Sequence, residues 1–320
     1  MLHLRIMAPA TMTDDILALF DDDCAVSGLA VFRGAAVRPA GDLIMAQVAR
    51  EGANDIVQQL RAMRVHQVGS IELERIDTWL SRKGFQAELR TPGSSADAVV
   101  WAEVGQRAYE DTELNWTYLS FLTLATVIAS IAIVLDSQIL VVGAMVLGPE
   151  FGPIAALGVA LIRRRFVLLQ LAIRTLVLGF VVAIGITIAA ALAARGLGWI
   201  TLADVDGPRP GTAFIYTPDK WSFIVAVIAG AAGVLSITSA KSLGMAGVFI
   251  SVTTVPAAAN IAMGVAFGDG KTVWGSVAQL LLNIAGMALA GWFTLAVQER
   301  VWSRISVRRA RHMSTPRRML

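Results

Sequence analysis

The sequence predicts an α-helical, polytopic membrane protein with a small α+β domain at its N-terminus. Hydrophobic residues make up 56% of its 320 residues and charged residues only 16%, whereas soluble domains are about 25% charged. The apolar residues gather in runs of the roughly 20 residues that a helix needs to cross a bilayer. Residues 1–90 instead hold short alternating elements, whose order is that of a ferredoxin-like domain.

The N-terminal domain is predicted to follow the pattern β-α-β-β-α-β. Its four strands are expected at residues 2–7, 26–32, 43–48 and 71–76. Thr13 supplies a predicted N-cap for a helix that continues to Phe20. Asn54-Asp55 opens a second helix, which has apolar residues on one face. This pattern indicates a fold and leaves the function open.

No cofactor, catalytic site or metal site is predicted. Cys24 is the only cysteine, and His3 and His66 lack the spacing of metal ligands. The apolar segments contain no Ser/His pair, HExxH motif or Asp dyad, so we do not expect an enzyme. Nucleic-acid binding is not expected either, because attraction to anionic lipid explains the arginine-rich C-terminal tail more simply.

Residues 115–297 are predicted to form a six-span transmembrane domain. A linker and an amphipathic helix (residues 91–114, the helix at 96–111) lead into it, and a basic tail (residues 298–320) follows. The expected spans are residues 116–135, 139–162, 166–194, 221–237, 243–267 and 273–297.

The orientation follows from the basic residues near the ends of the spans. Six spans place Arg163-Arg164-Arg165, Lys241 and the seven arginines after Val297 on one side. The prediction is therefore a multi-pass protein of the cell membrane (inner or plasma membrane), with both termini in the cytoplasm.

Spans one to three resemble spans four to six. Val142–Val146 aligns with Ala246–Ile250, about 104 positions further along. Because each half has an odd number of spans, the second half must be inverted. Spans two and five are both interrupted near prolines, at Gly148–Pro153 and at Ser251–Pro256. Paired broken helices in inverted repeats indicate a transporter-like site at the bilayer midplane, although proline kinks also serve packing alone.

Glu150 lies midway along span two, where a carboxylate is costly and normally faces a cavity or a partner. It is a candidate proton carrier or cation ligand; otherwise it pairs with a neighbouring helix or caps the broken one. Arg174 either reaches Glu150 or extends to the lipid head groups. The candidate substrate- or ion-binding residues are Glu150, Pro149, Gly152, Thr253, Thr254, Asn260, Arg174 and Asn283. Each polar residue of the second half could instead join helices to one another.

The segment Leu124–Pro153 contains Ala-Thr-Val-Ile-Ala-Ser, Asp-Ser-Gln and Val-Val-Gly-Ala-Met-Val-Leu-Gly-Pro. It resembles the uncharacterised hydrophobic-domain membrane family known as domain of unknown function 389, over about residues 115–260. The resemblance implies membrane location and fold and supplies no substrate. The family pattern has an apolar residue after the first proline, where this chain has Glu150.

Two functions are compatible with these features. The first is a transporter- or channel-like protein, coupled to protons or cations, with its site at the two broken helices. The second is a membrane-anchored sensor or regulatory scaffold, whose soluble domain binds a small ligand or a partner. The expected partners are the lipid bilayer, an unidentified small solute or ion, and further copies of the chain in a homo-oligomer.

Overall fold

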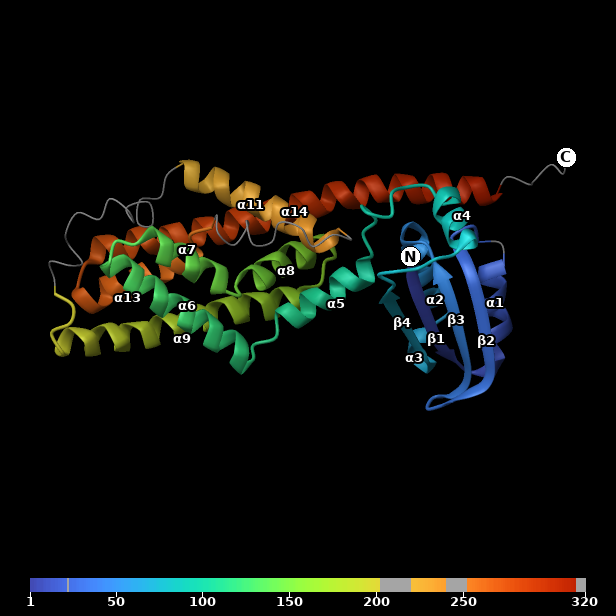
Figure 1. Ribbon diagram of the computed structural model, residues 1–320, viewed down its shortest axis with the longest axis horizontal. Helices are drawn as coiled ribbons and strands as arrows, with labels where there is room; N and C mark the ends of the chain where they lie inside the picture. The colour runs from blue at the N-terminus through green and yellow to red at the C-terminus, as the bar shows by residue number, and fades with distance from the viewer. Residues whose placement is uncertain (22, 202–219, 240–251, 315–320) are drawn as a thin grey trace. The chain divides into compact units, whose positions relative to one another are not determined.

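The computed structural model describes residues 1–21, 23–201, 220–239 and 252–314, with side chains up to Trp302. The chain folds into two compact units (Figure 1). One is built mainly from Met1–Val104. The other is built from Gly105–Ile237 and Ser242–Ala296.

The N-terminal unit contains a four-stranded antiparallel sheet of order β2-β3-β1-β4. Its core is apolar, and its largest fully buried side chains include Leu4, Ile6, Ile16, Ile44 and Ile56. In β1, inward residues alternate with more exposed ones, as expected for a sheet with one covered face. The elements are β1 (Leu2–Ala8), α1 (Thr13–Asp21), β2 (Val26–Val37), β3 (Ala40–Val48), α2 (Ala53–Ala62), α3 (Val65–Val68), β4 (Ser70–Arg75) and α4 (Arg82–Arg90).

The four strands and both helices of the predicted pattern are present, with three differences in detail. Strand β2 continues to Val37, so its turn to β3 is shorter than predicted. Thr13 is the first residue of α1 instead of its N-cap, and its hydroxyl donates to Asp42 Oδ2 at 2.7 Å. Helix α4 was not predicted, because it is short and rich in charge. Its N-cap Ser81 accepts a hydrogen bond from the Gly84 amide.

Residues 96–100 form the end of a turn and a non-helical segment, where an amphipathic helix was predicted from residue 96. Helix α5 (Trp101–Asp111) begins five residues later. Residues 98–100 are buried. Arg50 donates to the Ala98 carbonyl at 3.1 Å, and Asn54 donates to the Val99 carbonyl at 2.6 Å. These side-chain hydrogen bonds satisfy two backbone carbonyl groups that a helix would otherwise satisfy.

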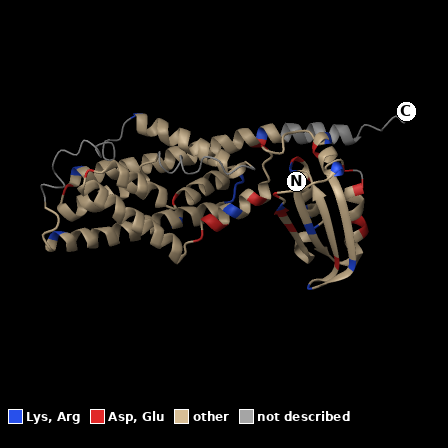
Figure 2. Cartoon of the chain, in the orientation of Figure 1, with Lys and Arg blue, Asp and Glu red and all other residues tan. Residues whose placement is uncertain are grey.

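The second unit is an apolar helical bundle, with few charged residues along its helices (Figure 2). Among the described residues, four helices are long and apolar enough to cross a membrane, and one bent pair makes a fifth candidate. The helices are α6 (Trp116–Val134), α7 (Gln138–Leu147), α8 (Phe151–Ile162), α9 (Phe166–Gly196), α11 (Lys220–Thr238), α13 (Thr254–Phe267) and α14 (Gly270–Ser314).

The predicted fifth span corresponds in part to α13, which is too short to cross a bilayer alone. The remainder of that span, including Ala246–Ile250 of the repeat alignment, lies outside the described residues. The described helices thus give four or five candidate spans where six were predicted. Helix α14 also runs past the predicted end at Val297, to Ser314.

The helix boundaries recur along the chain. Helices α6 and α11 each have 19 residues, and their first residues, Trp116 and Lys220, are 104 positions apart. Helices α9 and α14 begin at Phe166 and Gly270, which are also 104 positions apart. This is the offset at which the sequence aligned with itself.

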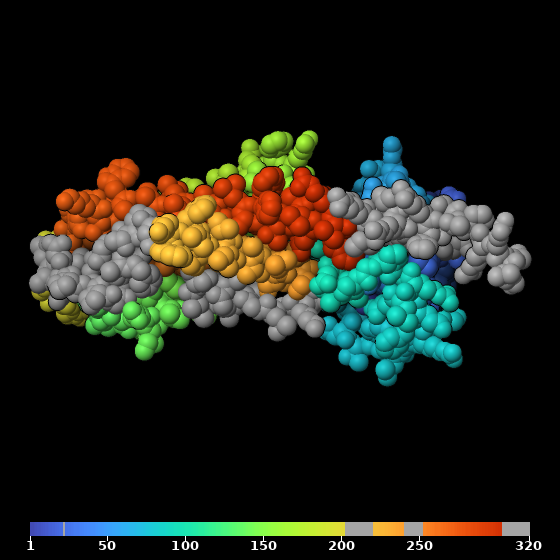
Figure 3. All heavy atoms as spheres, turned by 90° about the horizontal axis from the view of Figure 1, so that it is seen from above, coloured from blue at the N-terminus to red at the C-terminus, as the bar shows by residue number. Residues whose placement is uncertain are grey.

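Glycines let the helix backbones come close together. A Cβ added at Gly230 of α11 would lie 2.6 Å from the Met287 carbonyl oxygen of α14, and one added at Gly158 of α8 would lie 3.0 Å from the Trp292 nitrogen. Helices α11 and α14 run side by side on one face (Figure 3). Small residues at such positions give the close contacts on which helix association in membranes depends.

Gly230→Val is expected to destabilise the bundle by about 3 kcal/mol, because the clash is with backbone atoms that cannot rotate away. Gly185→Val on α9 is the matched control, since no described atom lies within 4 Å of a Cβ there. The measurement is the thermal unfolding of the purified full chain in detergent. Equal loss of stability in both variants would contradict the packing of α11 on α14.

Candidate functional site

The candidate site is built around a break between α7 and α8. Helix α7 ends at Leu147 and α8 begins at Phe151, and the two axes differ by 52°. Gly148, Pro149 and Glu150 fill the gap. Proline has no amide hydrogen to donate and clashes with the preceding turn, so the helix cannot continue through Pro149. The predicted interruption of span two is therefore present.

Glu150 projects from the break toward the start of α13. Its side chain is only 7% exposed. Its Oε1 accepts a hydrogen bond from the Thr254 hydroxyl at 2.5 Å. Its Oε2 is buried and has no hydrogen-bond partner among the described residues. Buried polar atoms normally have a partner, so this oxygen marks a place where a donor or a cation would be stabilised.

Gly148 leaves room for the carboxylate. A Cβ at this position would lie 2.3 Å from Glu150 Oε2 and 2.6 Å from a methyl carbon of Val255. Both are closer than atoms can approach, so any larger residue would displace the carboxylate from α13. Gly148 thus leaves space for a side chain, Pro149 interrupts the helix, and the Glu150 carboxylate occupies the space.

A second group of polar side chains lies between α13 and α14. Thr253 Oγ1 accepts hydrogen bonds from Asn283 Nδ2 at 3.0 Å and from Gln279 Nε2 at 3.3 Å. Further along α13, Asn260 Nδ2 donates to Ser276 Oγ at 2.8 Å. The amide oxygens of Gln279 and Asn260 are buried, with no partner among the described residues. Glu150 Oε2 and these two amide oxygens are therefore buried acceptors without a partner among the described residues.

The structure brings together most of the predicted site residues. Glu150 and Thr254 are hydrogen-bonded to each other. Thr253, the residue before Thr254, is hydrogen-bonded to Asn283. Asn260 lies further along α13. Pro149 lies within the break, and Gly152 lies in the first turn of α8. Arg174 is separate: it is exposed on α9, and no hydrogen bond or ion pair joins it to Glu150. The structure therefore does not join Arg174 to Glu150, and extension to the head groups stays a prediction.

Asp111 and Tyr118 were not singled out from the sequence. A Cβ at Gly152 would lie 2.9 Å from Cβ and Cγ of Asp111, so this acid packs on the first turn of α8. Burial raises the pKa of the Asp111 carboxyl, and Arg107 partly opposes the rise. Tyr118 of α6 is buried, and its hydroxyl has no hydrogen-bond partner among the described residues. Neither residue is part of a recognisable motif, because each acts across a helix–helix contact.

The apolar helices define a membrane-embedded protein. Residues 145–289 match the model of the family Domain of unknown function (DUF389), which confirms the resemblance found in the sequence. "Uncharacterized protein MJ0678" of Methanocaldococcus jannaschii is 25% identical over 194 residues, which cover 61% of this chain and 58% of that protein. The chain therefore aligns with less than two thirds of that relative's length. No solved structure matches this chain.

Proposed function

We propose that the protein is a transporter- or channel-like membrane protein, coupled to protons or small cations, with its site at the junction of the broken helix α7–α8 and the start of α13. The observation that carries this proposal is the buried Glu150 carboxylate, with one oxygen bonded to Thr254 and the other unsatisfied among the described residues. An intramembrane acid at a broken helix is expensive and is characteristic of ion pathways.

We also propose that the two halves of the helical bundle form an inverted repeat, and the spacing of the helices supports this. Helices α6 and α11, and likewise α9 and α14, begin 104 positions apart, and Glu150 and Thr254 are separated by the same 104 positions. The end of α9 meets the end of α13, because Arg195 donates to the Ala266 carbonyl at 2.9 Å. Helix α14 starts just after α13, so α9 ends where its counterpart α14 begins. This contact supports opposite directions for α9 and α14, which two inverted three-helix halves would require.

The chemistry of the site favours a proton or a cation over an anion. Glu150 contributes a carboxylate, and the amide oxygens of Gln279 and Asn260 also lack a partner among the described residues. Hard cations prefer oxygen ligands, and an unsatisfied carboxylate oxygen can also accept a proton. An anion would be repelled by the carboxylate and by the two amide oxygens.

The remaining parts of the proposal concern topology. We propose six spans with both termini in the cytoplasm, a ferredoxin-like N-terminal domain, and a non-enzymatic protein that assembles as a homo-oligomer in the cell membrane. The element order and the antiparallel strand order support the assignment of the N-terminal domain. The basic residues of the sequence support the orientation.

Flux measurements on the full chain in proteoliposomes test the function. Gradients of H⁺ and Na⁺ are imposed in turn, and ion movement is followed with a pH dye and with radioactive sodium. The expected result is flux of one of the two ions above that of protein-free liposomes. Flux equal to that of protein-free liposomes under every gradient would contradict the transport proposal.

A further inference from the structure

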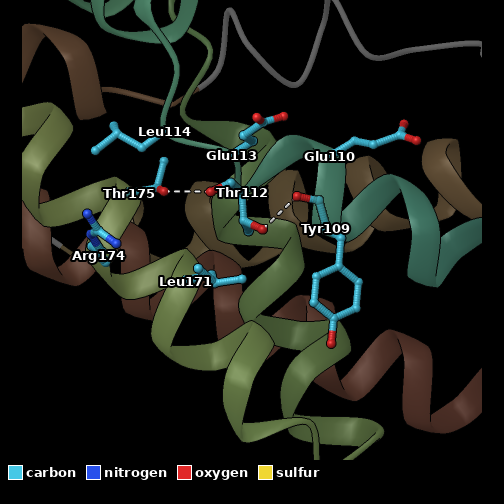
Figure 4. Close-up of a pocket in the computed structure, with 8 residues that line it drawn as sticks. All are labelled: Tyr109, Glu110, Thr112, Glu113, Leu114, Leu171, Arg174 and Thr175. Carbon is cyan, nitrogen blue, oxygen red and sulfur yellow. Dashed lines mark hydrogen bonds between the residues drawn. The ribbon is translucent and has the colours of Figure 1, made fainter.

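A hollow of about 380 Å³ lies beside α9, at the elbow where α5 turns into α6 (Figure 4). It is separate from the Glu150 site and combines both signs of charge with apolar side chains. Arg174 comes from α9, and the acids Glu110 and Glu113 come from the end of α5 and the elbow. The full lining is Tyr109, Glu110, Thr112, Glu113, Leu114, Leu171, Arg174 and Thr175.

The hollow lies at the level where the membrane-spanning part of the bundle begins. The Thr175 hydroxyl donates to the Thr112 carbonyl at 2.6 Å, which places Arg174 level with the elbow before α6. Helix α6 starts at Trp116, whose side chain is 84% exposed, and exposed tryptophans mark the membrane–water interface. The 31 residues of α9 span about 46 Å, well beyond the roughly 30 Å hydrocarbon core, so part of this helix extends into the head-group layer.

Arg174 is available to bind an anion at this level. Its guanidinium is exposed, and no ion pair or hydrogen bond joins it to any residue that the structure describes. A guanidinium is always charged and binds phosphate through two parallel hydrogen bonds. The anion that is concentrated at this depth is the phosphate of a phospholipid.

The two acids decide which phospholipid fits. Glu110 and Glu113 are exposed on the rim of the same hollow. They repel a lipid of net negative charge and attract an ammonium group that can donate hydrogen bonds. Leu114 and Leu171 offer apolar surface to the glycerol and the first carbons of the acyl chains.

We propose that this hollow binds the head group of an ethanolamine phospholipid from the surrounding bilayer. The phosphate is bound by Arg174, and the ammonium lies at Glu110 and Glu113. The bound lipid wedges between the α5–α6 elbow and α9. This site does not depend on the proposed transport function, because none of its residues contacts Glu150.

The test is native mass spectrometry of the full chain in detergent, with phosphatidylethanolamine, phosphatidylglycerol and phosphatidylcholine of matched acyl chains. The wild type is expected to retain phosphatidylethanolamine best. Arg174→Gln is expected to reduce its binding about tenfold, the effect of losing a charge-assisted hydrogen bond. Glu113→Gln is expected to shift the preference toward phosphatidylglycerol.

Arg107→Gln is the charge-matched control, since Arg107 is exposed on α5 and does not line the hollow. Its lipid binding is expected to equal that of the wild type. Equal loss in Arg107→Gln and Arg174→Gln would overturn the site, and so would equal retention of all three lipids by the wild type. Glycerophosphoethanolamine has the same head group without acyl chains. If it displaced the lipid at equal concentration, the ligand would be a soluble phosphate ester instead.

Discussion

Glu150→Gln is expected to reduce ion flux through proteoliposomes by at least tenfold while the chain still folds. Glutamine has nearly the same shape and can still hydrogen-bond to Thr254, so the contact between the broken helix and α13 is kept. It lacks the negative charge that would stabilise a bound cation and cannot take up a proton. Hydrogen bonds that involve a charge contribute about 1.5–3 kcal/mol, which corresponds to roughly ten- to a hundredfold in binding.

The control is Glu74→Gln, which removes an exposed carboxylate from β4 of the N-terminal domain. Its flux is expected to equal that of the wild type. Glu150→Asp, which keeps the charge on a shorter side chain, is expected to retain part of the flux. If Glu150→Gln transported at the wild-type rate, the carboxylate would have only a structural role at the break.

Thr254→Val is expected to have the second largest effect, because it removes the donor that satisfies Glu150 Oε1. Both carboxylate oxygens would then be buried without a partner among the described residues. Leaving such a group unsatisfied costs about 1–3 kcal/mol, and more when it is charged. We expect a lower unfolding temperature in detergent together with a flux reduced about tenfold.

Thr254→Ser keeps the hydroxyl and is expected to behave nearly as the wild type. The double variant Glu150→Gln/Thr254→Val is expected to be no more impaired in flux than Glu150→Gln alone, because the two residues act as one unit. Additive losses would indicate that Thr254 and Glu150 contribute separately, against the hydrogen bond between them.

The sequence predicted the break at Glu150 because its cause is local. Proline at position 149 removes an amide donor and clashes with the preceding turn, which kinks or breaks a helix, and an acid in an apolar run indicates a buried polar site. The placement of Thr253 and Thr254 opposite the break followed from the repeat. Their bonding pattern did not, since the contacts of Thr253 with Asn283 and Gln279 depend on how α13 and α14 pack.

Other features depended on contacts that no spacing reveals. Asp111 seemed to end an amphipathic helix, yet it packs on Gly152 of α8. Residues 98–100 were predicted to be helical but are not. Arg50 and Asn54 donate hydrogen bonds to the carbonyl groups of Ala98 and Val99. Arg174 was predicted either to reach Glu150 or to extend to the head groups, and only the hydrogen bond of Thr175 to Thr112 fixes its level at the elbow.

Labelling of Glu150 with a hydrophobic carbodiimide, a reagent that attacks protonated carboxyls in apolar surroundings, tests most directly whether this carboxyl exchanges ions. The full chain is labelled in membranes at several pH values and Na⁺ concentrations, and the modified residue is identified by peptide mass spectrometry. An exchanging site predicts an adduct at Glu150 that declines as pH or Na⁺ is raised. An absent adduct, or labelling that is indifferent to both, would contradict an ion site at the broken helix.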